Sequence, residues 1–233
     1  MKLYETKKLY YGKYLYKLVV TSTLAYSFRT EFQKDGRLDY ARLKLEEISK
    51  HYDRKSNTTV IQLPTDFRRY PDEISVNDYL NAKTLYYYLR TKSDYRIRCE
   101  SYQVIIFSND RQMLITLNNK LFNTYIEFWE PNPTNIDTLL TGDNIIIVDK
   151  KPDYEYKITF GNKKGKGTAA LAKWIDANPS LAKMTSYTKH YCKSGYGLGG
   201  MYFYAKNKKA LFMIQMIVSD NIQRVDKLIY TAE

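Results

Sequence analysis

Three pairs of tyrosines at alternate positions are the residues of this sequence best suited to ligand chemistry. The pairs are Tyr14 with Tyr16, Tyr154 with Tyr156, and Tyr202 with Tyr204. Because the side chains of a strand alternate between its two faces, each pair shares one face if its segment is a strand. On an exposed face the rings would form a platform for stacked bases, worth about 1–3 kcal/mol per base. On a buried face they would be core residues with hydrogen-bonded hydroxyls. Both faces stay open at this point.

Basic side chains accompany these aromatic residues. The chain has 37 Lys and Arg against 25 Asp and Glu, a net charge of +12, together with 24 tyrosines in 233 residues. This combination is typical of proteins that bind single-stranded nucleic acid through phosphates and stacked bases. Arg96 and Arg98, in an expected strand, are candidate phosphate contacts. The alternative is compositional, because an AT-rich genome raises Lys, Asn, Ile and Tyr through codon usage.

Two basic loops add candidate contacts. The segment Gly161–Gly167 places Lys163, Lys164 and Lys166 before an expected helix N-terminus, where free N–H groups and the helix dipole favour an anion. Its glycine spacing differs from that of a Walker loop. A solvated turn is the alternative reading. The second loop holds Arg68 and Arg69 beside Tyr70, between two prolines.

A glycine-rich segment precedes one of the tyrosine pairs. Gly195–Gly200 has the spacing of a dinucleotide-binding loop, but it leads into an expected strand instead of a helix, which argues against that site. With Lys193, Tyr196 and the aromatic run Tyr202–Tyr204, it resembles a stretched form of the RNP1 segment of RNA-recognition motif domains. The spacing departs from that motif, and Leu198 replaces an aromatic residue. The resemblance implies that Tyr196, Tyr202 and Tyr204 contact RNA.

Catalytic chemistry has few candidates. His190 lies among Lys189 and two tyrosines, so an endoribonuclease with His190 as general base is an alternative function. Lys189 and Lys193 flank Cys192 and would favour its thiolate form. Two Cys and two His do not supply a Cys/His zinc site of ordinary spacing, and only a carboxylate site stays open. We expect no metal, no cofactor and no catalysis.

The expected elements follow one pattern twice. Each half reads strand–helix–strand–strand–helix–strand, the ferredoxin-like βαββαβ plan. Tyr14–Lys17 matches Tyr154–Lys157, and Asn109–Leu114 matches Asn207–Phe212. We therefore predict an α+β protein of two tandem ferredoxin-like modules from an internal duplication. The modules span residues 1–132, with a helical insert at about 57–92, and 144–233, with a linker at 133–143. Tandem ferredoxin-like CRISPR RNA-processing proteins resemble this architecture.

Local signals give more detailed expectations. We predict helix caps at Asp78, at Asn109 or Asp110, at Thr168 and at Asn207. The second strand of the second half is less distinct and is expected near residues 184–192.

Composition also bears on the class of protein and on its cellular compartment. The sequence shows no secretory signal and no apolar run of the ~18 residues that a membrane-spanning helix needs. Two cysteines favour a reducing compartment, and we expect the cytoplasm. The residue bias suits a phage- or virus-encoded accessory protein. The expected partner is single-stranded RNA, ahead of DNA. A further alternative is a virion or host-interaction protein whose basic face binds an acidic protein.

Overall fold

The computed structural model describes residues 1–29, 38–52, 58–64, 70–142, 144–162, 167–195 and 197–231. It is an α+β protein whose chain divides into two compact units. The first unit holds residues 1–6 and 13–132, and the second holds 7–12 and 133–233. The segment expected as a linker contains the short helices η4 (Pro133–Asn135) and α4 (Ile136–Leu140) and belongs to the second unit.

The first unit is built on a five-stranded sheet in the order β1-β7-β2-β6-β5. Its strands are β1 (Lys2–Glu5), β2 (Tyr16–Thr21), β5 (Tyr95–Glu100), β6 (Gln103–Ser108) and β7 (Ile126–Glu130). The helices are η1 (Ala25–Phe28), α1 (Asp39–Ser49), α2 (Val76–Leu89) and α3 (Arg111–Lys120). Strands β3 (Val60–Gln62) and β4 (Glu73–Ser75) pair in a separate antiparallel hairpin within the expected insert.

The second unit repeats this plan in the order β10-β11-β9-β12-β8. Its strands are β8 (Ile145–Val148), β9 (Tyr156–Phe160), β10 (Ala182–Lys183), β11 (Tyr202–Ala205) and β12 (Ile222–Tyr230). The helices are α5 (Thr168–Ala177), α6 (Ser186–Ser194), α7 (Lys208–Val218) and the short η5 (Ser219–Asn221).

The two sheets share every strand neighbour and direction. In each, four antiparallel strands have the ferredoxin-like order, and a fifth strand runs parallel at one edge: β1 beside β7, and β8 beside β12. The matched tyrosines Tyr16 and Tyr156 each begin the first antiparallel strand of their unit. The predicted pair of βαββαβ modules is confirmed, and the repeat extends to a parallel edge strand in each unit.

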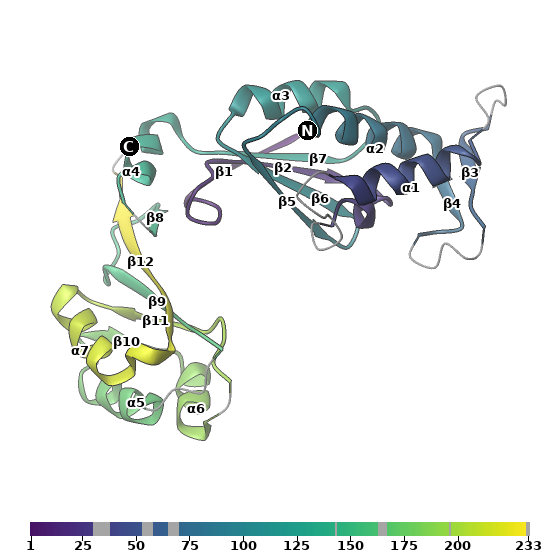
Figure 1. Ribbon diagram of the computed structural model, residues 1–233. Helices are drawn as coiled ribbons and strands as arrows, with labels where there is room; N and C mark the ends of the chain where they lie inside the picture. The colour runs from purple at the N-terminus through teal and green to yellow at the C-terminus, as the bar shows by residue number, and fades with distance from the viewer. Residues whose placement is uncertain are drawn as a thin grey trace. The chain divides into compact units, whose positions relative to one another are not determined.

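Helices cover one face of each sheet, as Figure 1 shows. In the first unit Leu18 and Phe128 point from the strands into a core completed by Leu85 and other helix residues. In the second unit Ile158, Phe160 and Phe203 pack against Leu171 and Ile214 from the helices. Each such fully buried side chain stabilises the fold by about 1.5–3 kcal/mol. The opposite face of each sheet has no helix on it among the described residues.

Two predicted helix caps are confirmed. The Asp110 carboxylate accepts a hydrogen bond from the Met113 N–H at 2.8 Å, and the Asn207 side chain accepts one from the Ala210 N–H at 3.0 Å. Both bonds satisfy an N–H that has no partner within its helix. These caps fix where α3 and α7 leave the preceding strands β6 and β11.

Two other predicted caps are wrong. Helix α2 begins at Val76, so Asp78 lies inside its first turn, where the carboxylate accepts a 2.7 Å bond from the Thr23 N–H. Helix α5 is capped by Gly167, which has a φ of 96°, and the Thr168 hydroxyl donates to the Cys192 carbonyl at 3.2 Å. In both cases a contact distant in sequence takes the side chain that the local pattern assigned to the cap.

The expected strand near 184–192 is also wrong. The second strand of this module is the two-residue β10, and the Thr185 hydroxyl then caps α6 by accepting a 3.1 Å bond from the Thr188 N–H. A strand of two residues has too little alternation to recognise. Its consequence for the site is that Lys183 lies in the sheet, whereas His190 lies on a helix.

Candidate nucleic-acid interface

The helix-free face of the second sheet carries one of the predicted tyrosine pairs. Along β11, Phe203 is buried in the core, so Tyr202 and Tyr204 project from the opposite face. Tyr202 is 41% exposed and Tyr204 is half-buried, and their ring centroids lie 5.7 Å apart in an edge-to-face arrangement. This pair is therefore outside the core and available to a ligand.

Basic side chains surround these rings. Lys157 of β9 and Lys183 of β10 both lie opposite Tyr204 in register, on either side of β11. The Nζ atom of Lys157 lies 4.0 Å from the centroid of the Tyr202 ring, a cation–π contact. The sheet therefore places a cation in each strand that neighbours the tyrosines.

Further charged side chains lie next to Lys157. Arg224 of β12 is opposite Thr159 of β9, and its Nε donates to the buried carboxylate of Asp226 at 2.9 Å. Burial lowers the pKa of Lys8, and the nearby charges of Arg224 and Lys157 lower it further, whereas Asp226 raises it. Three cations thus share one carboxylate, which leaves this part of the face with net positive charge.

The other tyrosine pairs do not form platforms. Tyr156 packs against the core of the second unit, and Tyr16 packs against that of the first, 6.4 Å from Phe128. Tyr14 is buried. Tyr154 precedes β9, and its ring turns toward Tyr204, with centroids 6.4 Å apart. The Tyr154 hydroxyl donates to the Pro179 carbonyl at 3.2 Å, which fixes the ring beside the outward pair.

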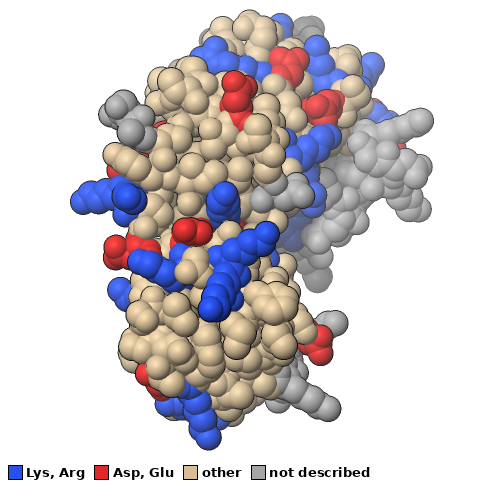
Figure 2. All heavy atoms as spheres, turned by 90° about the vertical axis from the view of Figure 1, so that its left-hand side faces the viewer, with Lys and Arg blue, Asp and Glu red and all other residues tan. Residues whose placement is uncertain are grey.

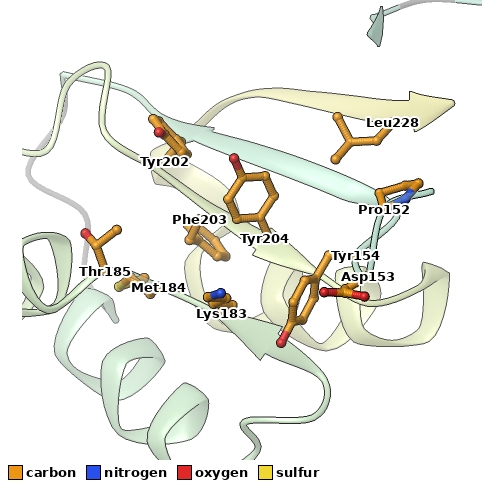
Figure 3. Close-up of a pocket in the computed structure, with 10 residues that line it drawn as sticks. All are labelled: Pro152, Asp153, Tyr154, Lys183, Met184, Thr185, Tyr202, Phe203, Tyr204 and Leu228. Carbon is orange, nitrogen blue, oxygen red and sulfur yellow. The ribbon is translucent and has the colours of Figure 1, made fainter. Parts of the chain in front are cut away.

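A pocket opens beside Tyr204, where β10 ends (Figure 3). Its volume is about 220 Å³. It is lined by Pro152, Asp153, Tyr154, Lys183, Met184, Thr185, Tyr202, Phe203, Tyr204 and Leu228. The pairing of β10 with β11 stops at Lys183, so the sheet edge next to Tyr202 is not extended by a longer strand. The pocket combines aromatic walls with one carboxylate and one ammonium group.

The predicted basic loops fall mostly outside the described residues. Lys163, Lys164, Lys166 and Tyr196 are not described, nor are Arg68 and Arg69. The segments that flank the first group do meet, because the Gly200 N–H donates to the Phe160 carbonyl at 3.1 Å. A methyl group on Gly199 would overlap the side chain of Asn162. The glycine-rich segment thus lies against the residue that precedes the lysine loop, at one end of β9 and β11.

Arg96 and Arg98 belong to the other unit. They project from β5 on the face opposite buried Ile97, and Arg98 forms an ion pair with Glu100. The first unit also lacks the tyrosine pair. Since Tyr16 is opposite Ser108 and Tyr156 is opposite Ala205, the counterparts of Tyr202 and Tyr204 are Ile105 and Phe107. Both of these are buried.

The Trp129 ring of β7 in the first sheet already has partners within the protein. Trp129 stacks on Tyr4 with centroids 4.6 Å apart, and the Lys17 Nζ lies 3.6 Å from the Trp129 centroid. Burial lowers the pKa of Lys17. We therefore centre the candidate interface on the second sheet, and the phosphate contacts expected of Arg96 and Arg98, in the first unit, stay a prediction.

His190 is exposed on α6, with its ring 6.0 Å from the Tyr191 ring. Cys192 of the same helix faces the core, so α6 covers the face of the sheet opposite Tyr202 and Tyr204. No group of three or more His, Cys, Asp or Glu side chains suited to a metal occurs in the part of the chain that is described. No described contact gives His190 a catalytic partner.

The expectation of a thiolate at Cys192 is wrong. Lys189 and Lys193 both pair with Asp176, and burial raises the pKa of Cys192 to about 11. Both lysines direct their ammonium groups to the Asp176 carboxylate, whereas the Cys192 side chain faces the core, so burial alone shifts the pKa of this thiol.

Sequence reasoning missed Lys8, Lys183, Arg224 and Asp226. Alternation around Val225 would have placed Arg224 and Asp226 on one face of β12. Lys183 was hidden by the shortness of β10, and Lys8 reaches the site from a segment far away in sequence. Over the face shown in Figure 2, basic side chains outnumber acidic ones.

Comparisons with protein-family models, curated proteins and solved structures found no significant match. None of the described helices is both long and apolar enough to cross a membrane.

Proposed function

We propose that this protein binds single-stranded nucleic acid without catalysis, RNA in preference to DNA, through the helix-free face of its second sheet. Bases stack on Tyr202 and Tyr204, while Lys157, Lys183 and Arg224 neutralise phosphates. The predicted contacts Lys163, Lys164, Lys166 and Tyr196 belong to the same unit and extend this surface in the proposal.

One observation carries the proposal: two outward tyrosines lie between strands that each bring a lysine to the same face. Aromatic rings stack on any base, and lysine ammonium groups bind the backbone phosphates. This arrangement therefore binds single strands with little sequence preference. A duplex would hide its bases from the rings. Two stacked bases at about 1–3 kcal/mol each would supply a large part of a micromolar affinity.

The test is fluorescence anisotropy with labelled 20-nucleotide single-stranded RNA and DNA, titrated across a salt series. We expect micromolar or tighter binding to RNA, weaker binding to DNA, and a linear fall of log affinity with log salt concentration. The double variant Tyr202→Ala/Tyr204→Ala is expected to lose roughly 10-fold or more in affinity and to retain the salt dependence of the unchanged protein.

Tyr187→Ala is the matched control, because Tyr187 is 61% exposed on α6, on the helix-covered side. It should bind like the unchanged protein. An equal loss of affinity in Tyr187→Ala and in the double variant Tyr202→Ala/Tyr204→Ala would contradict a platform on β11. Absence of binding to either oligonucleotide at low salt would contradict the proposal as a whole and would favour an acidic protein as the partner of this face.

A further inference from the structure

We propose that the pocket beside Tyr204 selects a guanine base from the bound strand, with Asp153 as the group that recognises it. This inference rests on the proposed function and adds base preference to a platform that stacks any base.

The size and walls of the pocket suit one base. Its volume of about 220 Å³ is below the roughly 300–1,000 Å³ of pockets for larger organic ligands. Tyr154 and Tyr204 supply aromatic surface, and Pro152 and Leu228 supply apolar surface (Figure 3). A planar ring that leaves the platform therefore finds a continuous apolar wall next to the last stacked position.

Two charged groups in the pocket have no charge partner among the residues that the structure describes. No hydrogen bond or ion pair joins the Asp153 carboxylate to another described residue, and the same holds for the Lys183 ammonium. Both side chains line the pocket, one before Tyr154 and one opposite Tyr204 in register. A ligand that complements both must present hydrogen-bond donors to the carboxylate and an anion to the ammonium.

A nucleotide with a guanine base meets both requirements. An ionised carboxylate only accepts hydrogen bonds, and its two oxygens accept a pair of adjacent donors. Guanine presents N1–H and the N2 amino group side by side. Adenine and cytosine each place one amino group next to a ring nitrogen that accepts, and uracil flanks its single N–H with two carbonyls. These acceptors would face a carboxylate oxygen and repel it. The phosphate of the same nucleotide lies within the reach of a lysine such as Lys183 on the sheet edge.

The experiment compares oligouridine ten nucleotides long with the same strand carrying one central guanosine, inosine or adenosine. We expect the guanosine strand to bind roughly 10-fold more tightly than oligouridine, the magnitude of one bidentate contact to a base. Inosine keeps N1–H but lacks the amino group, so it should lose most of that gain. Adenosine should give no gain in affinity over oligouridine beyond that of its stronger stacking.

The variant Asp153→Asn should abolish the preference, so that it binds the guanosine strand and oligouridine with equal affinity. Asp137→Asn is the matched control, since Asp137 is an exposed carboxylate on α4 of the same unit. Oligouridine binding with no guanosine preference, or a preference that survives Asp153→Asn, would overturn the inference while the proposed function stands. Failure of every strand to bind would instead remove the proposed function itself.

Discussion

The ammonium of Lys157 and the ring of Tyr202 form a cation–π contact across neighbouring strands, with 4.0 Å between Nζ and the ring centroid. An exposed contact of this kind is worth about 0.5–1 kcal/mol, less than the ~1–3 kcal/mol of a stacked base. In the proposed complex a base would therefore displace the ammonium from the ring, and the ammonium would then bind a phosphate. In the first unit Trp129 has Lys17 and the stacked Tyr4 against it, so the same exchange would need to break two contacts.

This exchange predicts the behaviour of Lys157→Ala. Loss of one phosphate contact should weaken RNA binding and reduce the slope of log affinity against log salt by about 0.7. Anisotropy titrations at several salt concentrations measure both quantities. Lys173→Ala, an exposed lysine on α5, removes the same charge on the helix-covered side and should change neither. Tighter binding by Lys157→Ala would mean that the lysine only covers the ring.

Much of the fold could be predicted, because its signals are local. The caps at Asp110 and Asn207 and the apolar strand before each one lie within a few residues of each other. The errors arise where contacts between residues far apart in the sequence determine the local structure. Asp78 accepts from Thr23, 55 residues away, and β1 forms only because Lys2–Glu5 lies beside β7. Such pairings leave no periodic pattern in the segment itself.

The site was predicted only in part, for a related reason. The tyrosines of β11 were identified, but the choice of face depends on which aromatic residue of the strand packs on the helices, and that residue is Phe203. In β9 the pattern offers Tyr156 and Lys157 on opposite faces, and the tyrosine is the one that packs inward. Arg96 and Arg98 lie in the first predicted module, and no pattern in the sequence indicates which of the two sheets carries outward tyrosines.

Gly167 is expected to be essential to the second unit. Its φ of 96° favours glycine, and a methyl group there would overlap the carbonyl oxygen of Ile217 in α7. Gly167→Ala should therefore destabilise this unit by about 3 kcal/mol or more, as measured by urea unfolding. Gly195→Ala is the matched control, because Gly195 also has a positive φ, of 70°, but has open space around it. Its cost should be about 1 kcal/mol, and equal losses would show that overlap with Ile217 is unimportant.

The raised pKa values of the two thiols predict that the free energy of unfolding falls at alkaline pH. Burial raises the pKa of Cys99 to about 12 and that of Cys192 to about 11. The unfolded chain loses these protons near pH 9, before the folded protein does. The thiols therefore contribute stability that is present below pH 9 and is lost as pH rises through 11 to 12. Unfolding free energies measured between pH 8 and 11 should fall less steeply in Cys192→Ala than in the unchanged protein. Identical slopes, or rapid reaction of native Cys192 with a disulfide reagent at pH 8, would contradict its burial.

Asp226→Asn should move stability and affinity in opposite directions. The Asp226 carboxylate is 3% exposed, accepts a hydrogen bond from Arg224, raises the pKa of Lys8 against the effect of burial and lies opposite Lys157 in register. Its loss leaves these charges to repel one another, so we expect the second unit to lose about 1–3 kcal/mol of stability in urea unfolding. The same change removes the negative charge beneath the proposed phosphate path and should raise RNA affinity roughly two- to fourfold at low salt.

Opposite signs make this variant informative, because a destabilised platform would by itself bind less. Asp220→Asn serves as the control, since Asp220 is an exposed carboxylate in η5 of the same unit. It changes the net charge equally and should leave the unfolding free energy within about 0.5 kcal/mol of the unchanged value. If Asp226→Asn weakened RNA binding at temperatures where the unit stays folded, Arg224 and Lys8 would lie outside the path of the strand. The phosphates would then have to follow Lys157 and Lys183, toward the β10 edge of the sheet and away from Arg224.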